Sequence, residues 1–409
     1  MNCRFCGTEL KYVFVDLGEA PPSNSFLNAA QLDKPESYFP LKIFVCSNCF
    51  LVQVDEYKKA NEIFDSEYAY FSSYSTSWLA HAKTYTEKMV DRFGISNNSL
   101  VVEIASNDGY LLQYFKEKEI PVLGIEPTES TAKVAREKGI ESITEFFGED
   151  FAKKLTSENR KADLLLGNNV LAHVPDINDF VKGLKVALKK EGVITMEFPH
   201  LLKLIENNQF DTIYHEHFSY FSFTTVSRIF EAHGLVMFDV DEIPTHGGSL
   251  RIYAGHKEDT SKSISDKVGE LLERENGIGI SDLNYYKGFG EKVSRIKMDL
   301  LQFLAEQKKN NKKVAAYGAA AKGNTLLNYC GISNDVIRFV VDASPYKQGK
   351  FLPGSHIPIV KEEMIREEKP EFILILPWNI KEEIINQLSY IREWGGQFVI
   401  SIPELQVIK

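Results

Sequence analysis

The sequence predicts an α/β protein in which a small irregular module precedes two sheet-containing domains. Short apolar runs alternate with amphipathic stretches between residues 99 and 254, and again between residues 313 and 400. This alternation is typical of parallel strands joined by crossover helices. The first 65 residues lack it and are interrupted by prolines. A chain of 409 residues also exceeds what one hydrophobic core usually serves, so several domains are expected.

The expected boundaries divide the chain into residues 1–68, 69–256 and 257–409. The first module should hold one short strand at 41–45, and the central domain should open with a helix at about 73–94. Its strands are expected at 100–105, 122–125, 163–167, 192–198 and 250–254, with crossover helices such as 131–138 and 177–189. The charged segment 258–310 predicts a helix that links the two larger domains. The last domain should carry strands at 313–317, 337–341, 372–376 and 397–400.

The composition narrows the class of protein. Hydrophobic residues make up 44% and charged residues 25%, which excludes disorder. A net charge of -10 argues against a polyanionic partner, so no nucleic acid is expected. The first residues lack the charged and apolar regions of an export signal, and no run of about 18 apolar residues occurs. We therefore expect a monomer in the cytoplasm that does not insert into a membrane.

Four of the five cysteines form two Cys-x-x-Cys pairs, Cys3 with Cys6 and Cys46 with Cys49. A disulfide framework is a poor explanation in a chain of this size and expected compartment. Each pair can present two thiolates to one ion, and four sulfur donors favour tetrahedral zinc. A closed four-sulfur site leaves no position for water or substrate, so this zinc should be structural. Cys330 is expected to pack in the core.

A strand-loop-helix cradle is expected at residues 101–111, with Glu103 at the strand end and Asn107, Asp108 and Gly109 in the turn. The Gly-x-Gly-x-x-Gly sequence that brings a pyrophosphate against the backbone is missing. S-adenosylmethionine (SAM) has no pyrophosphate and instead carries a sulfonium, an amino acid end and a ribose. Acidic and polar groups suit these features. The sequence therefore favours SAM over a dinucleotide.

Further side chains belong to the same expected crevice. Glu126 closes the next strand, where its carboxylate can accept hydrogen bonds from two ribose hydroxyls. Asn168 and Asn169 end a third strand, at the position where a doubly wound sheet opens its ligand site. Phe146 and Phe147 either flank the adenine or pack in the core. The expected cofactor-binding residues are Glu103, Ser106, Asn107, Asp108, Gly109, Glu126, Phe147 and Asn168.

The segment from Tyr214 to Tyr220 concentrates titratable side chains in a way that packing does not require. On a strand, His215 and His217 would share one face, whereas Tyr214 and Glu216 would share the other. On a helix or in a turn this grouping would not hold. A metal site would need a third ligand, and no His-Glu-x-x-His motif is present. A neutral imidazole is the side chain best suited to take a proton near pH 7. Acid-base chemistry is therefore favoured over metal binding, with His173 on the same crevice.

The chain as a whole resembles the SAM-dependent C-methyltransferases of deoxysugar biosynthesis, which methylate C3 of nucleotide-linked 4-keto-6-deoxysugars. The resemblance rests on the two Cys-x-x-Cys pairs and on four further segments, which are Val-Glu-Ile-Ala-Ser-Asn-Asp-Gly, Tyr214 to Tyr220, Thr-His-Gly-Gly-Ser-Leu-Arg at 245–251, and Tyr-Gly-Ala-Ala-Ala-Lys-Gly-Asn-Thr at 317–325. It implies a zinc-binding module, a central Rossmann-like SAM domain and a C-terminal Rossmann-like domain that helps to hold the sugar nucleotide.

The resemblance also implies roles for individual residues. A base removes the C3 proton next to the ketone, and we expect His217 to be that base. Tyr214, Glu216 and His173 would position the sugar or stabilise the enolate oxygen. Lys322 lies in a loop whose amides can meet a diphosphate. The expected substrate contacts are Tyr68, Tyr70, His215, Arg251, Lys322 and Asn324.

Two other functions compete with this one. An NAD-dependent nucleotide-sugar dehydrogenase would also be a Rossmann enzyme, but the missing triple glycine disfavours it. A zinc-knuckle protein that binds nucleic acid is disfavoured by the acidic charge and by the two α/β domains.

Overall fold

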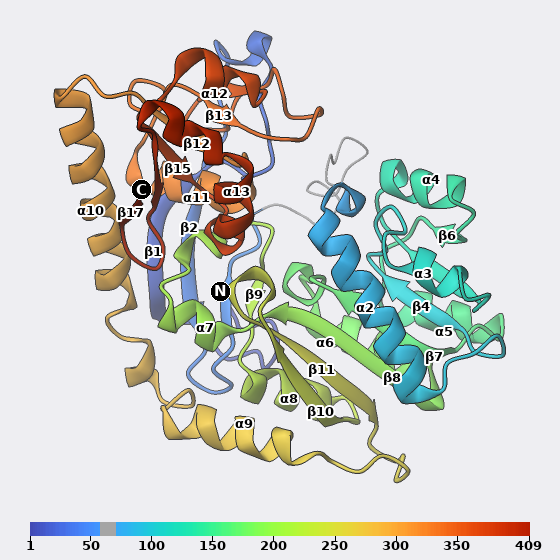
Figure 1. The fold of residues 1–409 in the computed structure, drawn as a ribbon. Coiled ribbons are helices and arrows are strands. Elements are labelled where there is room, and N and C mark those ends of the chain that lie inside the picture. Colours follow the sequence, from blue (N-terminus) through green and yellow to red (C-terminus); the bar gives the residue numbers. More distant parts are fainter. Residues whose placement is uncertain (58–70) are drawn as a thin grey trace.

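The computed structural model describes residues 1–57 and 71–409, and it is an α/β fold in three connected parts (Figure 1). The fold class expected from the sequence is confirmed. Tyr68 and Tyr70 lie outside the described residues. Among the residues that are described, no helix combines the length and apolar character needed to cross a bilayer.

The N-terminal module is built on a four-stranded antiparallel sheet with the order β1-β2-β3-β9. Its strands are β1 (Tyr12–Ala20), β2 (Phe39–Val45), β3 (Val52–Val54) and β9 (Ser219–Tyr220). The last strand comes from the middle of the chain and pairs Tyr220 with Val52. The histidine-rich segment that precedes β9 is thereby attached to the N-terminal module.

The central domain holds a seven-stranded sheet with the order β10-β11-β8-β7-β4-β5-β6. Its strands are β4 (Val101–Ile104), β5 (Val122–Ile125), β6 (Ser142–Ile143), β7 (Ala162–Asn168), β8 (Leu188–Pro199), β10 (Leu235–Ile243) and β11 (Ser249–His256). Strands β4 to β8 pair in parallel, whereas β11 pairs antiparallel with both β8 and β10. The helices are α2 (Thr76–Phe93), α3 (Leu112–Lys116), α4 (Glu129–Glu137), α5 (Glu149–Ser157), α6 (Ile177–Ala187), α7 (Leu201–Glu206) and α8 (Phe223–Ala232).

The strand order fixes where this domain binds a ligand. From β4 the chain runs outward through β5 to β6 and then returns to the other side of β4 to form β7. The loops that follow β4 and β7 therefore diverge and leave a crevice at the carboxyl ends of these strands. Glu103, Asn107 and Asn168 all lie at this position.

The C-terminal domain repeats the same principle in a sheet with the order β14-β13-β12-β15-β16-β17. Its strands are β12 (Val314–Tyr317), β13 (Val340–Val341), β14 (Ile359–Val360), β15 (Phe372–Ile375), β16 (Gln397–Ile400) and β17 (Gln406–Ile408), of which only the last pairs antiparallel. Its helices are α11 (Ala321–Cys330), α12 (Glu363–Glu368) and α13 (Lys381–Gln387). The crevice of this sheet lies between the ends of β12 and β15.

The linker between the two larger domains is not one helix. It consists of α9 (Asp266–Gly277) and α10 (Phe289–Lys309), so the expectation of continuous helix over 258–310 is wrong. The break contains Gly279 and Gly288, both with positive φ, which lets the chain turn between the two helices (Figure 1). Glu275 anchors α9, because its buried carboxylate accepts hydrogen bonds from His200 and from the backbone amides at the start of α8.

The N-terminal module does not have a separate core. Apolar residues of β1 to β3 pack in one cluster with α10, α11 and strands of the C-terminal sheet. Phe14 of β1 stacks on Phe289 of α10 with ring centroids 4.5 Å apart. The N-terminal module and the C-terminal domain, which are distant in sequence, therefore stabilise each other.

Candidate active site and zinc centre

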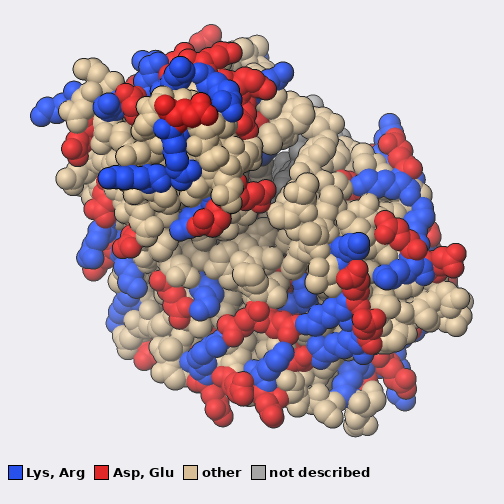
Figure 2. All heavy atoms as spheres, viewed as in Figure 1, with Lys and Arg blue, Asp and Glu red and all other residues tan. Residues whose placement is uncertain are grey.

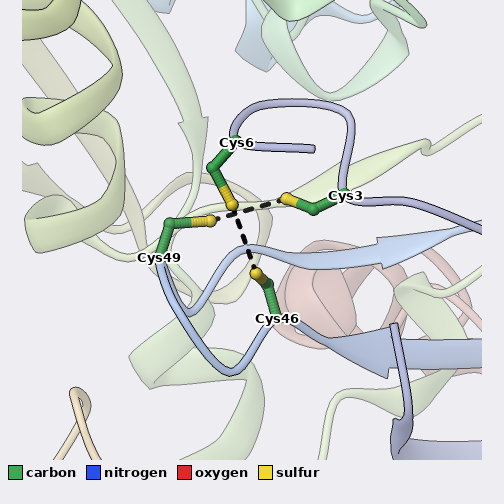
Figure 3. Close-up of side chains that lie close together, drawn as sticks. All are labelled: Cys3, Cys6, Cys46 and Cys49. Atoms are coloured by element: carbon green, nitrogen blue, oxygen red, sulfur yellow. Dashed lines mark hydrogen bonds between the residues drawn. The ribbon is translucent and has the colours of Figure 1, made fainter. Parts of the chain in front are cut away.

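The four paired cysteines converge on one point, with their sulfurs directed toward one another (Figure 3). All four sulfurs lie within 4.8 Å of one another, and the distances Cys3–Cys49 and Cys6–Cys46 are both 3.5 Å. A tetrahedral zinc ion with bonds of about 2.3 Å needs sulfurs about 3.8 Å apart. The four cysteines therefore fit zinc.

The two Cys-x-x-Cys turns share the same backbone hydrogen bond. The carbonyls of Cys3 and Cys46 each accept a hydrogen bond from the amide four residues later, of Gly7 at 2.9 Å and of Phe50 at 3.0 Å. Both closing residues have a left-handed conformation. The buried Gln53 side chain donates to Cys3 Sγ at 3.2 Å, which helps to balance the negative charge of the thiolates. Four sulfurs complete the coordination, so this zinc is structural.

The turn after β4 has an unusual backbone. Ala105, Asn107 and Gly109 have φ angles of 54°, 49° and 75°, so every second residue is left-handed. Alternation of this kind turns successive amide N–H groups toward one side and forms a concave, polar surface. Asn107 Oδ1 also accepts the backbone amide of Ser72, which joins the turn to the start of α2.

Several buried polar atoms at the carboxyl ends of β4 and β7 lack a partner among the described residues. They are both carboxylate oxygens of Glu103, Asp108 Oδ1, both side-chain polar atoms of Asn168, and Asn169 Oδ1. A buried polar group without a hydrogen bond is costly, so this cluster indicates a missing ligand with several donors. The ammonium and hydroxyl groups of SAM supply such donors, and the crevice therefore fits the cofactor.

The remaining expected cofactor residues surround this cluster in different ways. Glu126 accepts the amides of Asn107 and Thr128, both at 2.9 Å, and so braces the turn after β4. The Ser106 hydroxyl points toward Gly124 of β5. A Cβ at position 124 would lie only 2.4 Å from Ser106 Oγ, so this contact requires glycine. Gly109 packs against α4, and its absent Cβ would lie 2.4 Å from Ile140 Cδ1.

The structure places Phe147 against α6. Its ring meets Phe180 edge-on at 5.4 Å, which gives it a packing role. Phe146 is 43% exposed.

Lys138 holds Asp108 in place, because Lys138 Nζ donates a hydrogen bond to the backbone carbonyl of Asp108 at 2.8 Å.

We predict that Glu103→Gln weakens SAM binding by about tenfold, because the cation loses a carboxylate partner. Burial raises the pKa of Glu103 well above its usual range, with Tyr110 opposing the shift. A bound cation favours the carboxylate, so the affinity of the wild type should rise with pH until it passes this raised pKa. Calorimetric titration with SAM at several pH values measures both effects.

The control is Glu137→Gln, which removes the same charge from an exposed position on α4. It should bind SAM as the wild type does. If Glu103→Gln matched the wild type at every pH, the carboxylate would have no part in cofactor binding.

The histidine-rich segment forms a tight turn and not a strand. The amide of His217 donates to the carbonyl of Tyr214 at 2.9 Å, and β9 begins only at Ser219. His215 and His217 therefore do not share a strand face, as expected for a turn. The turn sends His215 toward β2, where Nε2 lies 3.2 Å from the carbonyls of Phe39 and Pro40.

His217 and His173 face each other with ring centroids 4.7 Å apart, and both have the same tautomer. His217 Nδ1 lies 2.9 Å from the carbonyl of Thr212, and His173 Nδ1 lies 2.8 Å from that of Glu216. A carbonyl only accepts, so each Nδ1 carries a proton and each Nε2 carries the lone pair. Tyr214 then donates its hydroxyl hydrogen to His217 Nε2 at 2.7 Å.

Both imidazoles are neutral near pH 7. Burial, and then the proximity of His173, hold the pKa of His217 well below its usual range. Burial lowers the pKa of His173 to about 4. A neutral imidazole carries a lone pair that can take a proton, so the cluster is suited to general-base chemistry.

Asn24 of the N-terminal module reaches into this cluster. Its Nδ2 donates to both carboxylate oxygens of Glu216, at 2.9 and 2.8 Å. The neighbouring carbonyl of Ser23 accepts Asn324 Nδ2 of α11 at 2.6 Å. Sequence reasoning missed Asn24, whose only local indication is the preceding pair of prolines.

The C-terminal domain also contributes directly. Lys322 donates to Asn379 at 2.9 Å and lies 5.0 Å from the Trp378 ring, while Trp378 donates to the buried carboxylate of Asp211 at 2.7 Å. Lys322 is close enough to His217 to lower its pKa. Arg251 is not among these groups, since it forms a buried ion pair with Glu197 at 2.9 Å. The space-filling view in Figure 2 shows a hollow between the C-terminal and central domains.

The fold and the crevice define a SAM-dependent methyltransferase with a structural zinc. Residues 78–240 match the family model described as a methyltransferase domain, and residues 3–64 match a zinc binding domain. Residues 244–403 match the C-methyltransferase C-terminal domain.

The chain belongs to the C-methyltransferase family. It is 34% identical over 407 residues to "C-methyltransferase NovU" of Streptomyces niveus. The matched region covers 100% of this chain and 96% of that protein. Among solved structures, magnesium protoporphyrin IX methyltransferase from Synechocystis PCC 6803 with bound SAM covers 43% of this chain and 78% of its own, at 14% identity and a TM-score of 0.33. The PH0226 protein from Pyrococcus horikoshii OT3 covers 49% of this chain and 100% of its own, at 17% identity and a TM-score of 0.39.

Proposed function

We propose that this enzyme methylates C3 of a nucleotide-linked 4-keto-6-deoxysugar in the cytoplasm. The observation that carries the proposal is the pair of neutral histidines, His173 and His217, beside the Tyr214 hydroxyl. A carbon acceptor must lose a proton before it can attack a methyl group. A ketone at C4 acidifies the C3 proton, and a buried neutral imidazole is suited to remove it.

In this mechanism the bound cofactor supplies the electrophilic methyl group. His217 Nε2 takes the C3 proton, and its Nδ1–H remains fixed by the Thr212 carbonyl. Before this transfer the Tyr214 hydroxyl turns from Nε2 to the C4 oxygen of the sugar, which exposes the Nε2 lone pair, and the hydroxyl then stabilises the charge of the enolate. Glu216, held by Asn24, and His173 position the sugar. The zinc lies in the N-terminal module and does not enter the reaction.

The C-terminal domain supports the nucleotide part of the proposal. Lys322 lies at the first turn of α11, after the loop that follows β12. A lysine together with the amides of a helix N-terminus suits a diphosphate. We place the diphosphate here, with Asn324 holding the adjoining loop of the N-terminal module.

Incubation with SAM and a panel of nucleotide-linked 4-keto-6-deoxysugars tests this proposal. We expect a product that has gained one methyl group and lost the C3 proton, measured by mass spectrometry and NMR. Panel members that lack the 4-keto group are the controls and should not react. Methyl transfer to oxygen, or equal turnover of the reduced sugars, would contradict the proposal.

A further inference from the structure

His246 has a conformation that its side chain does not favour. It lies in the turn between β10 and β11 with φ 55° and ψ 21°, next to Gly247 and Gly248. A left-handed residue other than glycine costs roughly 1 kcal/mol or more and persists only where its surroundings require it. Both following glycines are also left-handed or nearly so, with φ of 88° and 117°. The whole turn is therefore shaped to hold this imidazole in place.

The imidazole of His246 contacts the cofactor crevice through Asn169. His246 Nε2 lies 3.0 Å from Asn169 Nδ2. An amide nitrogen only donates, so Nε2 must accept, and the imidazole is neutral with its proton on Nδ1. Burial, and then Lys322, lower the pKa of His246 to about 4, which agrees with a neutral imidazole.

The backbone of Asn169 is fixed at the edge of the crevice. It follows β7 with φ 56°, and its backbone amide donates to the carbonyl of Glu197 at 2.7 Å. With Nδ2 fixed by His246, the other end of the amide is also fixed in direction. That end, Oδ1, is buried and has no hydrogen bond with any described residue.

A series of side-chain contacts connects His246, the partner of Asn169, with Glu103. Trp78 meets His246 edge-on at 5.4 Å and stacks on Tyr110 at 6.0 Å. Tyr110 in turn is close enough to Glu103 to lower the pKa of its carboxyl group. Glu103 and Asn169 therefore belong to one enclosure, at the ends of the neighbouring strands β4 and β7.

We propose that His246 is a positioning residue that orients the Asn169 amide so that its oxygen accepts a hydrogen bond from the ammonium group of SAM. Among the described residues, Asn169 Oδ1 has no donor, and the Glu103 carboxylate has only the Tyr110 side chain near it. A sulfonium has no N–H or O–H to donate, whereas an ammonium has three donors. The ammonium is the part of the cofactor that satisfies both acceptors.

Two substitutions separate this role from a purely structural one. Gln tends to place an amide group near the Nε2 position of His, whereas Asn ends near the Nδ1 position. His246→Gln therefore keeps an acceptor for Asn169, and His246→Asn removes it. Asn tolerates the left-handed conformation well, so the second variant should fold.

Calorimetric titration with SAM and with S-adenosylhomocysteine, in the absence of any sugar, measures the effect. We expect His246→Asn to weaken both ligands by about tenfold, the size of one hydrogen bond to a charged group. His246→Gln should restore most of the affinity. In a double-mutant cycle, His246→Asn should have no further effect once Asn169 is replaced by Ala.

The control is His233→Asn, which removes the other His–Asn hydrogen bond, 2.8 Å from His233 Nε2 to Asn178 Oδ1, away from the crevice. Wild-type affinity in His246→Asn, an equal loss in His246→Gln, or a loss confined to SAM would each overturn the proposal. Because no sugar is present, these results do not depend on the proposed sugar substrate. A negative sugar panel would leave them unchanged.

Discussion

Replacing His217 with Asn is expected to lower the rate of methyl transfer by roughly 10³-fold or more, in the upper part of the range for a lost general base. The Asn amide can still donate to the Thr212 carbonyl that now accepts His217 Nδ1–H, so the turn should keep its shape. The variant lacks the lone pair of Nε2 and cannot take the C3 proton. SAM binding should not change, because the side-chain hydrogen bonds of His217 go to Tyr214 and Thr212 and not to Glu103, Asn168 or Asn169.

Two measurements test this prediction. Exchange of the C3 proton with deuterium in a bound keto sugar reports the proton transfer itself, and it should disappear in His217→Asn. The matched control is His256→Asn. His256 is the last residue of β11, whose first residue, Ser249, follows the turn that contains His246, and this variant should retain full exchange and turnover. If His217→Asn remained active, the base would have to be His173, Tyr214 or Glu216.

Removing the zinc is expected to have the largest effect on stability. Structural zinc contributes on the order of 10 kcal/mol in small domains, which exceeds the net stability of many proteins. The N-terminal module shares its core with the C-terminal sheet, so its loss exposes apolar surface of both. Treatment with a chelator, or Cys46→Ser, should therefore lower the unfolding temperature by many degrees.

Methyl transfer should be lost together with the zinc, although the ion takes no part in the chemistry. The release of zinc, measured with a colorimetric chelator, should coincide with the loss of near-UV circular dichroism and of turnover. Cys330→Ala is the control, because it removes a buried sulfur from α11 and leaves the four ligands in place. A zinc-free protein with unchanged melting and activity would show that the cysteines do not stabilise the fold.

Local patterns in the sequence predict most of the secondary structure and the zinc ligands. The apolar run expected at 100–105 is β4, and the two Cys-x-x-Cys pairs meet as expected. In these cases the physical cause acts within a few residues. Periodic apolar positions define a strand, and two thiolates in one turn define half of a metal site.

The contacts between domains could not be predicted in this way. Asn24 and Glu216 are separated by 192 positions, and β9 has only two residues, too few to show any alternation. Their pairing depends on how three domains pack. The sequence leaves the choice between a strand and a turn for Tyr214 to His217 open for the same reason, because the contact of His215 with β2 joins distant parts of the chain.

His246 illustrates a different limit. Within its segment, Thr245 to Arg251, the sequence indicates Arg251 as a substrate contact and gives no role to His246. The structure gives Arg251 an internal partner and leaves the left-handed His246 beside the crevice. Backbone conformation at a single residue is not visible in a sequence, except where glycines surround it.

The short strand β9 has a consequence for attempts to redesign the enzyme. Its two residues attach the turn Tyr214–His217 to the N-terminal sheet, Asn24 holds the turn from a second loop of that module, and Thr325 of α11 binds the Ile213 carbonyl just before it. His217, the base that we propose, therefore takes its position from all three parts of the chain at once. Exchanging the C-terminal domain with that of a relative would therefore move His217 as well as Lys322. If our proposal holds, new specificity has to be sought by point substitution within one intact chain.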